Sequence, residues 1–159
     1  MIEYRITKYN PKNRVNESYI VDEWTSISDI GKEFDAGVLT YEEYKKVEQS
    51  YVDCCIAILQ AAKISELAVC NPEYYDNAIR FPQLLRNEND VRWVVMCCLQ
   101  EKCWAKLETK NFFVHFGYDY YMYVGTNLSL PLVAAIAEKY SLFCECFASP
   151  YSSSNSNSI

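Results

Sequence analysis

One stretch in the last third of the chain constrains the fold more than any other. Residues 112–125 read FFVHFGYDYYMYVG and contain no Lys, Arg or Pro. Aromatic and β-branched side chains pack well on a pleated sheet and lose rotamer freedom in a helix, so this run predicts strands. Gly117 favours a turn, and we therefore expect a hairpin with strands at 112–116 and 120–124 around a turn at 117–119.

Phenols crowd the second half of this predicted hairpin. Four tyrosines fall within six residues, at Tyr118, Tyr120, Tyr121 and Tyr123. A buried phenol oxygen needs a hydrogen-bond partner, so a core-facing strand more often carries Val, Ile or Phe. The pattern therefore indicates a tyrosine-lined surface that binds a partner.

Helices are predicted on both sides of this hairpin in the sequence. Thr40 and Glu43 form a capping box before an apolar stripe, which predicts a long helix at 41–62. Similar reasoning predicts a short helix at 27–35 after Ser26, and a last helix at about 130–140 with Pro131 in its first turn.

Further strands are expected where short apolar runs end in turn residues. Because periodicity alone does not separate a short strand from a buried helix, a helix over 91–108 stays open as the alternative there. The expected strands are 2–9, 66–70, 91–99, 103–108 and 143–147. Together these elements predict a single α+β domain over 1–148, with an antiparallel meander of about five to seven strands covered mainly on one face by helices, followed by a disordered polar tail at 149–159.

The charge balance and the N-terminus limit the classes of partner. With 15 Lys and Arg against 21 Asp and Glu, the chain carries a formal charge of −6 and shows no basic cluster. Such a chain repels nucleic-acid phosphates and anionic lipid, so we expect a protein partner, basic in character, and neither nucleic acid nor membrane. No apolar segment has the length of an export signal or of a spanning helix, which predicts a cytoplasmic protein.

Catalysis would depend on the single histidine, His115. Cys103, His115 and Asp119 lie on or beside neighbouring predicted strands, so a small cysteine-dependent enzyme using Cys103 and His115 is the alternative function. However, no nucleophile sits on a glycine-flanked elbow, and the four glycines form no phosphate-binding loop. We interpret the eight cysteines as small apolar packing residues and expect neither a metal nor a cofactor.

Acidic residues mingle with aromatic residues at separate places in the sequence. Such groups are found at 22–24, 74–76 and 118–121. Tyr and Trp give large contact areas at a small entropy cost, and carboxylates select a basic partner. The candidate binding residues are Asp22, Glu23, Trp24, Tyr118, Asp119, Tyr120 and Tyr121.

Residues 22–32 (DEWTSISDIGK), residues 39–44 (LTYEEY) and the hairpin at 112–125 resemble small immunity proteins of bacterial polymorphic toxin systems, including those of contact-dependent growth inhibition. The resemblance implies a non-enzymatic inhibitor that binds one cognate toxin C-terminal domain, often a basic nuclease, and blocks its active site. On this hypothesis, the carboxylates among the candidate residues meet Lys or Arg of the toxin, and the aromatic rings fill its cleft.

Overall fold

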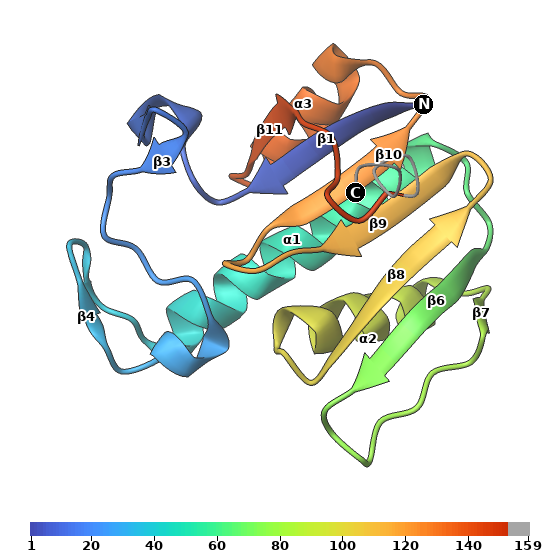
Figure 1. The fold of residues 1–159 in the computed structure, drawn as a ribbon, viewed down its shortest axis with the longest axis horizontal. Coiled ribbons are helices and arrows are strands. Elements are labelled where there is room, and N and C mark those ends of the chain that lie inside the picture. The colour runs from blue at the N-terminus through green and yellow to red at the C-terminus, as the bar shows by residue number, and fades with distance from the viewer. Residues whose placement is uncertain (153–159) are drawn as a thin grey trace, which may run out of the picture.

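The expected α+β fold is confirmed. A computed structural model describes residues 1–152, which form a seven-stranded antiparallel sheet and three α-helices (Figure 1). The sheet order is β11-β1-β10-β9-β8-β6-β7, so β8, β9 and β10 form a meander. The strands are β1 (Ile2–Thr7), β6 (Leu67–Tyr74), β7 (Leu84–Leu85), β8 (Cys103–Thr109), β9 (Phe112–Phe116), β10 (Met122–Thr126) and β11 (Phe143–Cys146). The helices are α1 (Tyr41–Ala61), α2 (Glu88–Leu99) and α3 (Leu130–Lys139).

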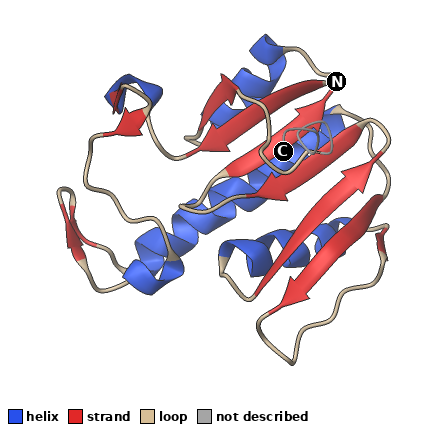
Figure 2. Cartoon of the chain, in the orientation of Figure 1, coloured by secondary structure: helices blue, strands red, loops and turns tan. Residues whose placement is uncertain are grey.

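The core lies between the sheet and its helices. Figure 2 shows α1 and α2 behind the strands, and Val133 and Ala137 of α3 belong to the same buried cluster. Strand β8 illustrates the two faces, because side chains alternate along a strand. Its residues Cys103, Ala105 and Leu107 are buried in the core. The residues between them, Trp104, Lys106 and Glu108, are only partly buried and lie on the opposite face of the sheet.

The two longer predicted helices are confirmed almost to the residue. Helix α1 begins with the predicted capping box, in which Thr40 Oγ1 accepts from the Glu43 amide and Glu43 Oε2 accepts from the Thr40 amide, both at 3.2 Å. Helix α3 begins at Leu130, with Pro131 in its first turn. Each helix ends one residue earlier than predicted, at Ala61 and Lys139.

The strand predicted at 91–99 is wrong, and the helix alternative holds for this segment. Residues 88–99 form α2, whose Asn87 side chain accepts from the Asp90 amide at 2.9 Å and so caps the helix. Its buried positions are 91, 94, 95, 97, 98 and 99, and most of them are separated by three or four residues, as on one side of a helix. Since the run also contains consecutive Val and Cys residues, its composition alone favoured a strand.

The helix predicted at 27–35 is also wrong. The chain makes a single 3-10 turn, η2 (Ile27–Asp29), and then a small hairpin of β4 (Glu33–Phe34) and β5 (Gly37–Val38). Gly31 and Gly37 adopt φ angles of +90° and +116°, which end any helix and suit only glycine well. A second small hairpin, β2 (Arg14–Val15) with β3 (Ser18–Tyr19), follows the 3-10 turn η1 (Pro11–Asn13) near the N-terminus.

The end of the predicted strand at 66–70 and the start of the predicted tail at 149 both differ in the structure. Strand β6 continues past the predicted end at residue 70, because a register irregularity between Cys70 and Glu73 accommodates Pro72. The expected tail is packed at its beginning, since Ser149 is completely buried and the ring of Tyr151 lies against Trp104. Residues 149–152 are named here the C-terminal strap, and the rest of the predicted tail, 153–159, lies outside the described residues.

Candidate functional site

The loop between β9 and β10 has an unusual backbone. The predicted second strand begins two residues late, at Met122, and the loop covers residues 117–121. Within it, Asp119 and Tyr120 have φ angles of +58° and +65°. Left-handed geometry at a bulky residue such as Tyr120 is rare and costs on the order of 1–3 kcal/mol.

Two tyrosine hydroxyls from other elements hold this loop in place. The hydroxyl of Tyr9 donates to the carbonyl of Asp119 at 2.7 Å, and that of Tyr51 donates to the carbonyl of Tyr120 at 2.9 Å. Tyr51 also accepts from the Lys8 amide at 2.7 Å, which ties the loop to the end of β1. Burial raises the pKa of Tyr9 and of Tyr51, so both phenols keep the proton that they donate.

The ring of Tyr120 anchors the loop in an aromatic cluster. It lies 5.0 Å from the rings of Trp24 and Tyr51 and 5.9 Å from that of Tyr44, measured between centroids. Its hydroxyl donates to Tyr44 at 3.1 Å. Tyr120 is therefore a core residue, which corrects its prediction as a binding residue.

The anchored loop leaves its tip in solvent. Tyr118 is 88% exposed, more than any other large hydrophobic residue of the described chain, and Asp119 is also exposed. Tyr121 is half-buried, and its hydroxyl accepts from Arg14 at 3.3 Å. Of the four predicted loop residues, Tyr118 and Asp119 are thus the most available to a partner.

The predicted group at 22–24 lies next to the loop but faces a different hollow. Asp22, Glu23 and Trp24 line a cavity of about 450 Å³ that none of the four loop residues lines. Glu23 already accepts from Lys8 Nζ at 3.1 Å and from the Tyr19 hydroxyl at 3.0 Å. The structure joins the two predicted groups through the contact of the Trp24 and Tyr120 rings and through the Tyr9 hydroxyl, which is hydrogen-bonded to the carbonyls of Trp24 at 3.3 Å and of Asp119 at 2.7 Å.

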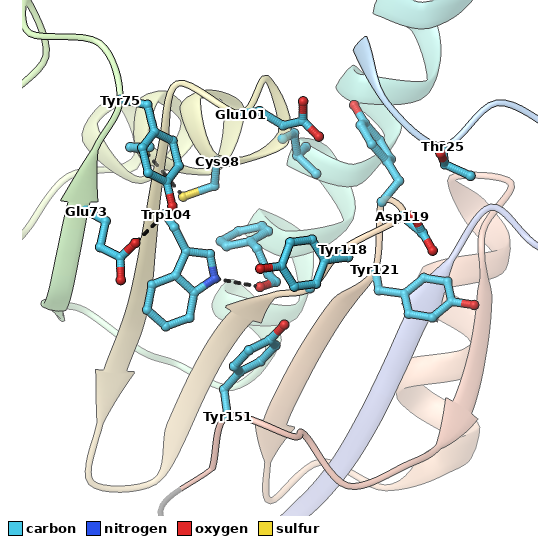
Figure 3. Close-up of a pocket in the computed structure, with 15 residues that line it drawn as sticks. Thr25, Glu73, Tyr75, Cys98, Glu101, Trp104, Tyr118, Asp119, Tyr121 and Tyr151 are labelled. Atoms are coloured by element: carbon cyan, nitrogen blue, oxygen red, sulfur yellow. Dashed lines mark hydrogen bonds between the residues drawn. The ribbon is translucent and has the colours of Figure 1, made fainter. Parts of the chain in front are cut away.

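Beside the loop tip lies a second cavity of about 510 Å³, named here the acidic aromatic pocket (Figure 3). Acidic and aromatic residues line it from β6 and the position just after it, the turn between α2 and β8, β8, β9, the β9–β10 loop and the C-terminal strap. Its carboxylates are Glu73, Glu101 and Asp119, and its aromatic side chains are Tyr75, Trp104, Phe116, Tyr118, Tyr120, Tyr121 and Tyr151. Thr25, Cys98, Leu99, Cys103 and Gly117 complete the lining.

Sequence reasoning missed most of this pocket. Tyr75 belongs to one of the acidic and aromatic groups in the sequence, but Glu73, Glu101, Trp104 and Tyr151 gave no local signal. Their meeting depends on the pairing of β6 with β8 and on the path of the strap. Neither can be derived from hydrophobic periodicity.

Hydrogen bonds fix several side chains of the pocket. Trp104 Nε1 donates to the Phe116 carbonyl at 2.9 Å, and the Tyr75 hydroxyl donates to Glu73 Oε2 at 3.0 Å (Figure 3). Glu101 Oε2 accepts from the Ser26 hydroxyl at 3.0 Å. Within residues 1–152, no Lys, Arg or His forms an ion pair with the pocket's carboxylates, so their charge faces the cavity without a cation.

The predicted pair of Cys103 and His115 is not brought together. Register pairing places Glu108 opposite Phe113, so His115 shares the face of Glu108, whereas Cys103 points into the helix-covered core. Cys103 instead contacts Cys98, with the two sulfurs 3.6 Å apart. The hydrogen bond to Cys98 lowers the pKa of Cys103, and the same bond together with burial raises the pKa of Cys98.

His115 has a structural setting. Its Nδ1 is hydrogen-bonded to Ser149 Oγ and its Nε2 to Glu108 Oε1, both at 2.8 Å. Burial lowers the pKa of His115 against the opposing effect of Glu108, so the imidazole is neutral near pH 7. Although Ser, His and Glu in contact resemble a hydrolase triad, Ser149 is completely buried and no substrate can reach its hydroxyl. The contact instead fastens the C-terminal strap to the sheet.

Residues 1–152 show neither a metal-binding cluster nor a helix that could cross a membrane. In the part of the chain that the structure describes, no three His, Cys, Asp or Glu side chains converge in a metal-binding arrangement. No helix there combines the length and apolar character needed to cross a bilayer. No protein-family model, curated protein or solved structure matches this chain, so the argument for function rests on its own residues.

Proposed function

We propose that this chain is an immunity protein, which binds the C-terminal domain of one bacterial toxin in the cytoplasm and blocks its active site. The observation that carries the proposal is the strained loop at 117–121, which presents Tyr118 and Asp119 beside the acidic aromatic pocket. Residues held in rare backbone geometry persist only where the surrounding structure over-determines them, and they cluster at active sites and ligand-binding positions.

The loop is suited to binding because it is rigid before a partner arrives. Two buried hydroxyl groups and the ring of Tyr120 fix its backbone, so little conformational entropy remains to be lost on association. Exposed tyrosines in such positions are frequent interface hot spots. Tyr118 therefore has the character of an anchor residue.

The charge of the chain supports a basic partner. The net charge is −6, and Asp119 at the loop tip lines the same pocket as Glu73 and Glu101, for which no ion pair is found within residues 1–152. A toxin that cleaves nucleic acid carries Lys or Arg around its active site to hold phosphates. In this mechanism Tyr118 enters the toxin's cleft, Asp119 pairs with one of those cations, and the substrate is excluded.

The test uses the toxin domain encoded next to this chain. The neighbouring open reading frame is examined for a large secreted protein with a variable C-terminal domain, and that domain is expressed with and without this chain. We expect the chain to restore growth and to bind the purified domain. Absence of any toxic neighbour, or a toxic domain that this chain neither binds nor neutralises, would reject the proposal.

Substitutions in the loop test whether it forms the interface with the toxin. Tyr118→Ala is expected to weaken toxin binding by about 30-fold or more, the effect of a hot-spot residue worth about 2 kcal/mol. Asp119→Asn removes the charge yet keeps a residue that tolerates positive φ, and it is expected to slow association and reduce its salt dependence. Tyr41→Ala, an exposed tyrosine on α1 outside the pocket lining, is the control. Unchanged affinity in the Tyr118→Ala, Asp119→Asn double variant would refute this placement.

A further inference from the structure

We infer that the acidic aromatic pocket is a receptor for one organic cation, the ammonium or guanidinium group of a single Lys or Arg side chain. The partner that supplies this side chain rests on the proposed function, whereas the binding of the cation to the pocket does not. The loop tip contributes Tyr118 and Asp119 to the lining of this cation site, and the other elements around the pocket contribute the rest.

The lining is complementary in charge to such a group. Three carboxylates, on Glu73, Glu101 and Asp119, line the cavity, and no Lys, Arg or His lines it. Their hydrogen-bond partners within residues 1–152 include the hydroxyls of Tyr75 and Ser26, which are neutral. Because no cation of the described chain pairs with them, an incoming cation would find carboxylates that need not first leave another ion pair.

The aromatic walls add a second attraction that favours organic cations. Cations bind over the faces of Trp and Tyr rings at about 6 Å or less, and Arg also stacks on them. The Trp104 ring is held by its bond to the Phe116 carbonyl, and the Tyr151 ring lies 5.5 Å from it between centroids. Tyr75 is held by its bond to Glu73. The Trp104 ring, held by its bond to the Phe116 carbonyl, loses little freedom when a ligand enters.

The other ligand classes fit less well. An anion such as a nucleotide would face three carboxylates without a compensating cation. A metal ion needs several ligand atoms at about 2–2.6 Å, and no such group of side chains exists among residues 1–152. The volume of about 510 Å³ falls in the usual range for small-ligand sites, and it leaves room for a side chain together with the flanking backbone of a partner.

The experiment follows the indole Nε1–H of Trp104 by two-dimensional NMR. The probes are N-acetyl-arginine amide, N-acetyl-lysine amide and the neutral isostere N-acetyl-citrulline amide. For probes of this size we expect a Kd on the order of 1 mM for a cation. The Trp104 signal should shift in a saturable and salt-sensitive way with a cationic probe, and citrulline amide should bind at least tenfold more weakly. The comparison of the first two probes shows which cation the pocket prefers.

Matched variants test the carboxylates. In Glu73→Gln, Glu101→Gln, each amide oxygen still accepts from its hydroxyl partner, so the pocket keeps its shape while it loses two charges. We expect at least a tenfold loss of cation affinity, whereas Glu42→Gln, on the exposed face of α1, should change nothing. An unshifted Trp104 signal in the ligand-free double variant verifies its fold.

The outcomes separate this inference from the proposed function. Equal binding of citrulline amide and the cations, no saturable shift with any probe, or full affinity in the double variant would each overturn the pocket as a cation receptor. All of these NMR titrations use this protein and the small probes alone, with no toxin present. If the Glu73→Gln, Glu101→Gln variant binds a toxin with wild-type affinity and neutralises it, the pocket has no role in the complex. The proposed function would still stand.

Discussion

The hydroxyl of Tyr51 offers the sharpest test of how the strained loop is held. The side chain is completely buried, and its oxygen joins two backbone groups, the carbonyl of Tyr120 at 2.9 Å and the amide of Lys8 at 2.7 Å. Tyr51→Phe keeps the ring and removes this oxygen. Both backbone groups then lose a partner in a region where water does not readily replace it.

The magnitude follows from the cost of buried polar groups without partners. Each costs about 1–3 kcal/mol, and the Tyr120 carbonyl is the more deeply buried of the two. We expect the free energy of unfolding to fall by about 3 kcal/mol. For a chain of this size, that corresponds to a decrease in Tm of about 6–12 °C.

Urea denaturation followed by circular dichroism measures the change, and an unaltered m-value shows that the same surface is exposed on unfolding. Tyr41→Phe, on the same helix but 59% exposed, is the control and is expected to change stability by less than about 0.5 kcal/mol. If Tyr51→Phe is as stable as that control, the hydroxyl does not hold the loop, and the argument that the loop is fixed before binding fails.

Three other predictions test the packing and the titration of the fold. Gly125→Ala would place a Cβ 2.2 Å from the Phe113 ring, so we expect the free energy of unfolding measured by urea denaturation to fall by about 1–3 kcal/mol. Adding Phe113→Leu should restore part of it. An unchanged free energy of unfolding would contradict the close approach. Because the pKa of His115 is lower in the folded protein than in the unfolded chain, the unfolded chain binds the proton more readily, and stability should fall as the pH drops below about 6.5. In His115→Asn the slope of stability against pH should be smaller. An identical slope would refute the lowered pKa of His115. Cys146 is the one exposed cysteine of the eight, so a thiol reagent should show a single fast reaction in the folded protein, which Cys146→Ser abolishes; a fast phase that persists would contradict this and would show that a less exposed thiol, such as the partly buried Cys70 or Cys144, reacts.

Local signals explain which parts of the fold were predictable. The capping box at Thr40 and Glu43 and the aromatic run at 112–116 specify their elements through neighbours in the sequence. The segment at 91–99 carried two conflicting signals, strand-like composition and helical spacing, and packing of its buried residues decided for the helix.

The candidate site was predictable only in part, for a physical reason. The sequence indicated Tyr118 and Asp119 because acidic and aromatic residues mingle at 118–121, next to a predicted turn. It did not indicate the left-handed backbone at Asp119 and Tyr120, which depends on hydroxyls contributed by Tyr9 and Tyr51. Contacts between residues more than 60 positions apart have no signature in a local pattern.

The position of β1 in the sheet has a consequence for how the chain is made. The ribosome makes β1 well before either of its neighbours in the sheet, because residues 122–126 of β10 and 143–146 of β11 lie much further along the chain. Pairings of such long sequence separation form slowly, because a large loop must close first. Strand β1 therefore lacks its sheet partners until residues 122–126 have been made, and a nascent chain stopped before residue 122 cannot complete the sheet.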